Sequence, residues 1–213
     1  KKDFSPNTPN NIEIWNAPFE RHNAVTLGAG FEWKPWIRYK VNNGERQYIN
    51  QAPIFSLNYK KGLADIDYDF AELGFKYSTK NIGGSRTDFK IIAGAFLNKD
   101  SLNLPDFKHF PGNQTILTVS DPVESFRLLP YYEYSTKDKF AQVHVHHQFR
   151  KLLLTQMPLF WMTGLKENAF LNYLSTPSSE NYVEVGYGLD NILKVFRVEL
   201  ITSFQDFKYH DFG

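Results

Sequence analysis

Polar and apolar residues alternate with a period of two along most of this chain. In residues 25–34 the odd positions carry Val, Leu, Ala, Phe and Trp, whereas the even positions carry Thr, Gly, Gly, Glu and Lys. Successive side chains of a β-strand point to opposite faces of a sheet, so this stretch predicts a strand with one apolar face and one small or charged face. A helix is not expected here, because its apolar face would require apolar residues every three to four positions.

The same alternation recurs to the end of the chain and predicts about ten strands. The predicted strands are residues 12–15, 25–34, 55–60, 71–78, 89–97, 126–135, 141–150, 168–174, 183–190 and 196–204. The intervals between them lack the period of an amphipathic helix and contain turn sequences such as Asn42-Asn-Gly44. We therefore expect an all-β, antiparallel fold.

Short and long connections alternate between the predicted strands. Residues 62–65 and 135–138 are short turns, whereas residues 99–124 form a long connection punctuated by Pro and Gly. This alternation is typical of outer-membrane barrels, which place short turns on one side of the membrane and longer loops on the other. We therefore expect an antiparallel transmembrane β-barrel, with apolar faces toward lipid and polar faces toward a water-filled lumen.

The placement and number of aromatic rings fit this expectation. Aromatic residues make up 16% of the chain, yet its mean hydropathy is −0.44, which indicates two kinds of surface interleaved along the strands. Rings near the ends of barrel strands form girdles at the two membrane interfaces. The candidates for these girdles are Phe31, Trp33, Tyr59, Tyr77, Tyr132 and Tyr134.

Composition excludes several classes of function. The formal net charge is +1, so the chain has no basic excess with which to bind nucleic acid. The chain has no cysteine, which excludes disulfides, a thiolate nucleophile and a cysteine-type zinc site. The longest apolar stretch, residues 152–162, contains Thr155, Gln156 and Pro158 and is shorter than the roughly 20 residues of a transmembrane helix.

Two blocks of sequence resemble a known family. The first comprises residues 128–140, 146–149, 152–154 and 157–159, and the second is residues 182–198. Together with residues 109–115, His-Phe-Pro-Gly-Asn-Gln-Thr, they resemble the C-terminal barrel of a Bacteroidota outer-membrane family of unknown function. Members of that family usually carry an N-terminal carboxypeptidase-regulatory-like domain.

That family is in turn distantly similar to the surface-antigen barrels of BamA and TamA. The similarity places a loop motif where those proteins have a Gly-rich loop that leads into an Arg-Gly pair, although no such pair follows it here. The motif residues are Phe110, Gly112, Asn113, Gln114 and Thr115.

The resemblance also bears on the extent of the domain. It implies that residues 1–213 are a portion of one barrel domain of about sixteen strands. N-terminal domains, the first strands and the last strand would be missing from this portion.

His144-Val-His-His147 is the densest group of titratable residues. His144 and His146 would share one face of a strand, but a zinc site needs three or four ligands and no third can be named, so they are only weak metal candidates. We instead expect a polar face that lines the lumen and includes Gln142, His144, His146, Gln148 and Arg150. No catalytic residue and no cofactor are predicted.

The leading hypothesis is a non-enzymatic β-barrel of the bacterial outer membrane. It would act in envelope protein assembly or transport, or as a scaffold in an outer-membrane complex. Its expected partners are the lipid bilayer and other outer-membrane proteins, and not nucleic acid. The alternative is a soluble β-barrel or sandwich that binds a small apolar ligand. A third and weaker hypothesis is a barrel-embedded hydrolase that uses His144 or His146.

Overall fold

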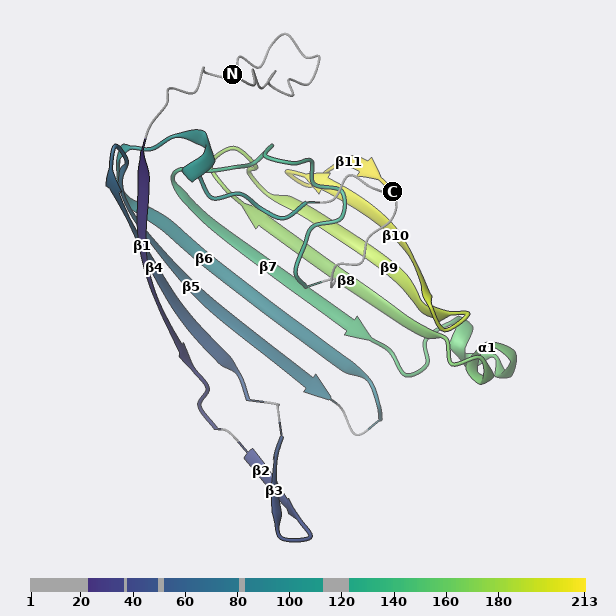
Figure 1. Ribbon diagram of the computed structural model, residues 1–213. Helices are drawn as coiled ribbons and strands as arrows, with labels where there is room; N and C mark the ends of the chain where they lie inside the picture. Colours follow the sequence, from purple (N-terminus) through teal and green to yellow (C-terminus); the bar gives the residue numbers. More distant parts are fainter. Residues whose placement is uncertain (1–22, 37, 50–51, 81–82, 113–122) are drawn as a thin grey trace, which may run out of the picture.

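The structure is a computed structural model that describes residues 23–36, 38–49, 52–80, 83–112 and 123–213 (Figure 1). Within these ranges most of the regular secondary structure is β-strand. The strands are β1 (Ala24–Trp33), β2 (Arg38–Asn42), β3 (Glu45–Ile49), β4 (Ile54–Ala64), β5 (Asp67–Lys80), β6 (Arg86–Ser101), β7 (Lys139–Gln148), β8 (Lys166–Ser175), β9 (Tyr182–Ile192), β10 (Phe196–Gln205) and β11 (Lys208–Phe212). The predicted strand at residues 12–15 lies outside the described residues.

Helical structure is limited to three short segments. They are η1 (Leu104–Asp106), η2 (Leu154–Gln156) and α1 (Pro158–Met162). No helix in the described ranges has the length and apolarity needed to cross a membrane.

Nine strands form one antiparallel sheet in the order β1-β4-β5-β6-β7-β8-β9-β10-β11. β2 and β3 form a separate hairpin that extends beyond one end of this sheet (Figure 1). The sheet is open within the described residues, because its edge strands β1 and β11 do not pair with each other. The predicted all-β, antiparallel fold is confirmed, and the described strands do not by themselves close a barrel.

The turn of the hairpin follows from its sequence. Asn43 and Gly44, between β2 and β3, have φ angles of 49° and 81°. A two-residue turn with positive φ at both positions matches the twist of the flanking strands, and Asn-Gly is the pair that adopts it at least cost. The turn predicted at Asn42-Asn-Gly44 is therefore confirmed.

The prediction of a strand at residues 126–135 is wrong. β6 and β7 pair directly with each other, from Arg86 opposite Gln148 to Ala95 opposite Lys139, so no strand lies between them. The backbone N–H groups of residues 127–129 donate to the carboxylate of Glu184 and not to a neighbouring strand. The connection between β6 and β7 is called here the β6–β7 loop, and its described parts, residues 102–112 and 123–138, lie over one face of the sheet (Figure 1).

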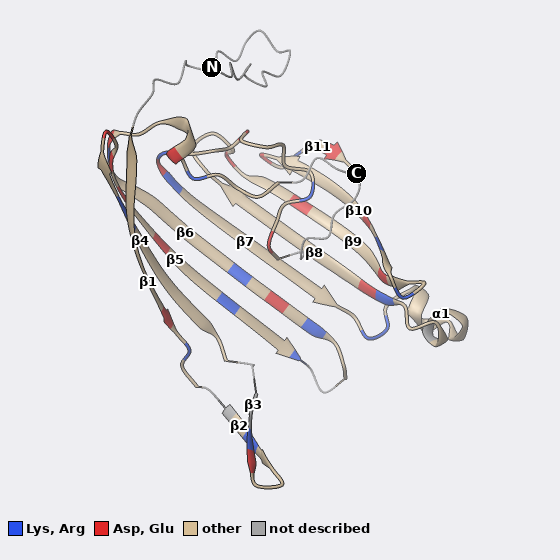
Figure 2. Cartoon of the chain, in the orientation of Figure 1, with Lys and Arg blue, Asp and Glu red and all other residues tan. Residues whose placement is uncertain are grey.

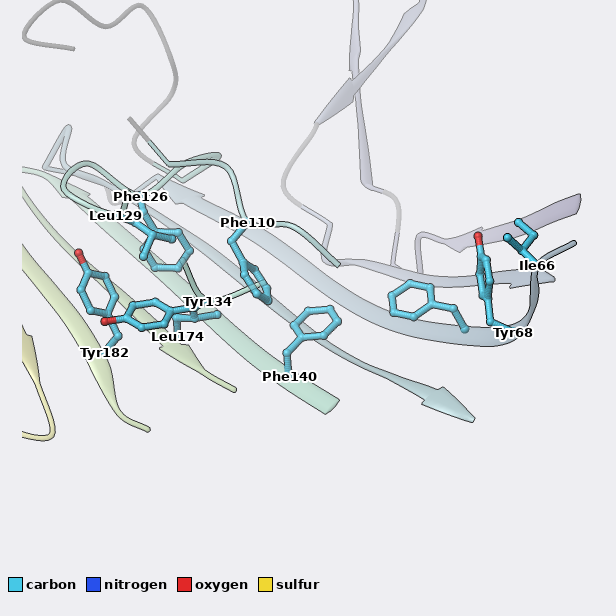
Figure 3. Close-up of a cluster of buried hydrophobic side chains, with 10 residues drawn as sticks. Ile66, Tyr68, Phe110, Phe126, Leu129, Tyr134, Phe140, Leu174 and Tyr182 are labelled. Atoms are coloured by element: carbon cyan, nitrogen blue, oxygen red, sulfur yellow. The ribbon is translucent and has the colours of Figure 1, made fainter. Parts of the chain in front are cut away.

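The face under this loop, the inner face, holds the hydrophobic core. Aromatic rings dominate the core, and they come both from the sheet and from the loop (Figure 3). Its buried members are Ile66, Tyr68, Phe70, Phe110, Phe126, Leu129, Tyr134, Phe140, Leu174 and Tyr182. The prediction that Tyr134 lies in an interfacial girdle is wrong, because this residue is only 4% exposed and packs in the core.

The opposite face, the outer face, is apolar and exposed. Register pairing places Phe31, Leu57, Leu73, Ala93 and Ala141 side by side across five strands. Leu73, near the middle of β5, is 61% exposed. Water-soluble sheets normally bury the apolar face and leave the polar face in solvent, so the arrangement here is inverted.

Candidate functional site

The most organised polar feature of the inner face is a row of side chains that crosses six strands. Register pairing aligns one residue from each of β5 to β10, and residues in register share a face of the sheet. We call this set the polar row, and its members are Lys76, Lys90, His144, Asn172, Glu184 and Ser203. Figure 2 shows that charged positions occur in the middle of β5 and β6 as well as near strand ends.

At one end of the polar row, the β6–β7 loop is held by an ionic clamp. Lys76 donates to Oε1 of Glu124 at 3.0 Å, and Lys90 donates to Oε2 at 2.6 Å. Partial burial by itself would raise the pKa of Glu124, but hydrogen bonds and charge from Lys90 and Lys76 outweigh it and lower that pKa. The carboxylate of Glu124 therefore binds one lysine of β5 and one lysine of β6.

In the middle of the row, the same loop packs on histidine. The ring of Phe126 lies 4.9 Å from that of His144, centroid to centroid. Nδ1 of His144 donates to Oδ1 of Asn172 at 2.8 Å, which fixes the imidazole within the row. His144 is 1% exposed, so this contact lies in the protein interior.

Farther along the row, the carboxylate of Glu184 binds the loop backbone. Three consecutive amides, those of Arg127, Leu128 and Leu129, donate to it at 2.8, 2.8 and 3.1 Å. Nδ2 of Asn172 and the hydroxyl of Tyr182 donate to it at 3.0 and 2.9 Å. Because Glu184 is fully buried, these five donors replace the water that its charge would otherwise require.

A buried ion pair fixes the loop to β10 next to this carboxylate. Nε of Arg127 lies 2.9 Å from Oε2 of Glu199, and the two side chains are 1% and 7% exposed. The guanidinium also donates to Oγ of Ser125 at 3.1 Å within the loop. Breaking such a buried pair by removing one partner typically costs about 3–5 kcal/mol.

The loop motif is described only in part. Phe110 packs edge-on against Phe140 at 5.3 Å, whereas Asn113, Gln114 and Thr115 lie outside the described residues. At Gly112, a Cβ would lie 2.2 Å from the carbonyl oxygen of Leu129. Glycine is therefore required there for two parts of the loop to approach each other.

The predicted polar face of β7 divides into buried and exposed members. Gln142, His144 and His146 lie on the inner face and are buried, Gln148 ends the strand half-buried, and Arg150 follows it exposed. Nδ1 of His146 lies 3.7 Å from Oδ2 of Asp88.

The structure does not assemble a metal site around these histidines. Within the described ranges, no three His, Cys, Asp or Glu residues are grouped closely enough to hold a metal ion. The two histidines instead face Asn172 and Asp88 on neighbouring strands.

A cavity of about 340 Å³ lies on the inner face near β1, beside the η1 segment. Gly28 and Gly30 of β1 contribute no side chain to it, and Tyr68 and Phe96 line it with their rings. Lys108 of the loop forms an ion pair with Glu72 at the cavity wall.

Comparison with protein families identifies the chain's relatives. The family model described as the C-terminal domain of DUF5686, a family of unknown function, matches residues 1–189. The chain belongs to this family. The matched region includes the described part of the β6–β7 loop and the polar row as far as Glu184, whereas Glu199 and Ser203 lie beyond it. Comparison with curated proteins and with solved structures gave no match.

Two of the residues that hold the loop in this family member are absent from the sequence predictions. Alternation places Glu184 only on the polar face of a strand, and it places Arg127 in a strand that does not form. The available signal was a carboxylate at an inner position of β9, flanked by Val183 and Val185 on the outer face. A charge at such a position requires partners, but alternation does not name them.

Proposed function

We propose that this domain forms part of the wall of a transmembrane β-barrel in the bacterial outer membrane. Its role would be non-enzymatic, in envelope protein assembly or transport, or as a scaffold in an outer-membrane complex. The observation that carries the proposal is the inversion of the sheet, whose outer face is apolar and exposed while its inner face buries polar and charged side chains.

The exposed apolar surface is too extensive for a water-soluble sheet. Large apolar side chains on β1, β4, β5, β6, β8, β9 and β10 remain exposed on the outer face. Water-soluble proteins rarely leave contiguous apolar patches larger than a few hundred square ångströms uncovered. Lipid would cover this face without any further protein layer.

Strand length and composition support the same proposal. The strands from β4 to β10 have 10 to 16 residues, and a tilted transmembrane strand needs about 9–11. The edges β1 and β11 would have to be paired inside a bilayer, because unpaired backbone groups are too costly there. We propose that further strands pair with them and complete a barrel of about sixteen strands.

The position of the β6–β7 loop indicates whether the proposed barrel would have an open or a plugged lumen. It packs on the inner face through the hydrophobic core, the Glu124 clamp and the buried pair of Arg127 with Glu199. A barrel with this loop inside would be plugged on this side, which favours assembly or scaffolding over free diffusion of solutes. The proposed likeness to surface-antigen barrels, and an N-terminal carboxypeptidase-regulatory-like domain, would fit such a role.

Site-directed labelling tests the proposal, because the chain has no cysteine of its own. Leu27→Cys and Gly28→Cys place a thiol on opposite faces of β1, and the space at Gly28 accepts a Cβ. In intact outer membranes, we expect a lipid-soluble maleimide to label Leu27→Cys and Leu73→Cys. A water-soluble maleimide should label only Gly28→Cys.

The alternative, a soluble module for a small apolar ligand, gives the opposite result. Leu27→Cys and Leu73→Cys would then react with the water-soluble reagent, and the protein would stay monodisperse without detergent. The cavity does not favour that ligand class, because Lys60, Glu72 and Lys108 contribute to its lining.

A further inference from the structure

A second exposed apolar surface lies at one end of the sheet, next to the strand ends of the outer face. It comprises the β7–β8 connection, which contains η2 and α1, and the turn between β9 and β10. Figure 1 places these segments together, and Nδ2 of Asn191 donates to the carbonyl oxygen of Gly164 at 3.3 Å. We call it the platform, and its exposed apolar residues are Leu153, Met157, Leu159, Met162, Leu193, Val195 and Phe196.

The platform is held in shape by a second buried carboxylate. Glu167, at the start of β8, accepts hydrogen bonds from the backbone N–H groups of residues 152–155, at 3.0 to 3.1 Å. The hydroxyls of Thr155 and Tyr187 also donate to it. Because Glu167 is fully buried, its hydrogen bonds hold the backbone of residues 152–155 against β8.

Large apolar side chains near this fixed segment are highly exposed, which favours their burial against a partner surface. Leu159 and Met162 are 73% and 80% exposed, and Leu193 and Val195 are 82% and 79% exposed. Apolar groups held in water by a fixed backbone cannot collapse together, and their burial elsewhere is favourable by about 25 cal/mol per Å².

The exposed charges around the platform are positive, whereas the nearest carboxylates, Glu167 and Asp190, are buried, and Asp190 pairs with Arg197 at 2.6 Å. Arg150, Lys151, Lys166 and Lys194 are exposed, and residues 150–166 and 191–197 contain no Asp or Glu. Apolar side chains rimmed by Lys and Arg are the combination with which proteins enter the interface of an anionic bilayer, because the cations bind phosphate groups while the apolar groups reach the acyl chains.

The platform is also continuous with the outer face. Phe196 begins β10, and Val198 and Leu200 follow it as exposed residues of the same strand. If lipid covers Val198 and Leu200, the same leaflet reaches Phe196 and the turn before it.

We propose that the platform inserts into the interfacial layer of the membrane that surrounds the sheet. Leu159, Met162 and Val195 lie at the level of the upper acyl chains, and Lys151 and Lys194 contact anionic headgroup phosphates. Glu167 is a positioning residue, which fixes residues 152–155 at the start of the segment that carries Leu159 and Met162. This inference rests on the proposed membrane location and adds a second site of lipid contact to it.

Spin-label accessibility in the full-length protein tests the inference separately from the proposed function. Single-cysteine variants Leu159→Cys and Met162→Cys report on the platform, Leu73→Cys on the outer face, and Glu45→Cys in the projecting hairpin serves as the water reference. The protein is reconstituted in nanodiscs that contain phosphatidylglycerol. We expect labels at positions 159, 162 and 73 to collide more with oxygen, which concentrates in lipid, than with a water-soluble nickel chelate.

The outcomes separate the two ideas. Nickel accessibility at positions 159 and 162 equal to that at position 45, with oxygen preference kept at position 73, would overturn the platform inference alone. Protection of positions 159 and 162 from both reagents would show a protein partner on the platform and would also overturn it. Nickel preference at position 73 would instead remove the proposed membrane location.

The Glu167→Gln variant tests the positioning role of the buried carboxylate. It should reduce the oxygen preference at positions 159 and 162 and leave that at position 73 unchanged. Glu180→Gln, at an exposed glutamate in the β8–β9 connection, is the matched control and should change none of them. Unchanged accessibility at 159 and 162 in a folded Glu167→Gln protein would contradict the role given to Glu167.

Discussion

At the scale of single residues, buried carboxylates organise this domain. Glu184 lies on the inner face of β9 and Glu167 on the outer side of β8, and each binds consecutive backbone amides of a connection that has no strand partner. A carboxylate has four lone-pair positions and no proton to donate, so it can satisfy several N–H groups at once. This is how irregular backbone is placed against a sheet without leaving buried donors unpaired.

Replacing Glu184 should therefore cost more than one hydrogen bond. In Glu184→Gln the amide nitrogen can accept nothing, so at least one loop N–H loses its partner in the interior. We expect the free energy of unfolding to fall by about 2–4 kcal/mol, measured by denaturant titration in detergent. Glu133→Gln, an exposed glutamate of the same loop, is the control and should change it little. Equal stability of the two variants would contradict the role given to Glu184.

A glycine substitution tests the close approach inside the loop. Ala at position 112 would place its Cβ 2.2 Å from the carbonyl oxygen of Leu129, so the loop must shift. We expect Gly112→Ala to destabilise the protein by about 1–3 kcal/mol and to increase proteolysis of the β6–β7 loop. Gly83→Ala is the matched control, because a Cβ there has no neighbour within 4 Å. Similar proteolysis of both variants would contradict the requirement for glycine at position 112.

At the scale of elements, the β6–β7 loop behaves as an internal layer of the fold. It supplies rings to the core, a carboxylate to two lysines of the sheet and an arginine to a glutamate of β10. These contacts are spread from β5 to β10, so the loop joins strands that do not pair with one another. We infer that its removal would loosen the sheet as a whole.

Acidity should release the Glu124 clamp. Because the pKa of Glu124 is lowered in the folded state, its stabilising contribution is complete above the unfolded pKa and is lost as pH falls through the folded value. The pair is partly exposed, so the contribution is about 0.2–1 kcal/mol. The stability difference between wild type and Glu124→Gln should be constant above about pH 5 and decrease as the pH is lowered further. A difference that does not change with pH would show that the clamp acts through shape and not through charge.

At the scale of the whole molecule, the distribution of polarity between the two faces decides the environment. The inner face is covered by the chain itself, whereas the described chain leaves the outer face uncovered. In the proposed membrane setting, lipid supplies the missing layer, and the platform extends that contact past the strand ends. In water, the same surface would lead to aggregation.

A charge on the outer face distinguishes the two settings. Leu73→Arg should reduce stability in bilayers by about 2–4 kcal/mol, because it places a cation among lipid tails. Glu45→Arg, in the projecting hairpin, should have no such effect. Unfolding titrations in bilayers and the yield of assembled protein in outer membranes measure both variants. Wild-type stability of Leu73→Arg in a bilayer would contradict a lipid-facing Leu73.

The local sequence pattern predicts most of the strands correctly, but it does not predict the structure of the β6–β7 loop. Residues 25–34 alternate cleanly and form β1 within one residue of the predicted bounds. Residues 126–135 are also rich in rings, yet they form no strand, and the N–H groups of residues 127–129 bind Glu184, which lies 55 to 57 positions away in the sequence. The hairpin strands β2 and β3 and the edge strand β11 are five residues each and were too short for alternation to reveal.

The sequence by itself determined the two-faced strands, their antiparallel order along the chain and the Asn-Gly turn, because period and turn chemistry are local properties. Only the tertiary structure decided that the polar face becomes the buried one. That outcome depends on the β6–β7 loop returning to the sheet, and on Glu124, Arg127 and Glu184 finding partners far away in sequence. Alternation shows that two faces exist, but which face is covered depends on contacts between distant segments, and no local pattern contains them.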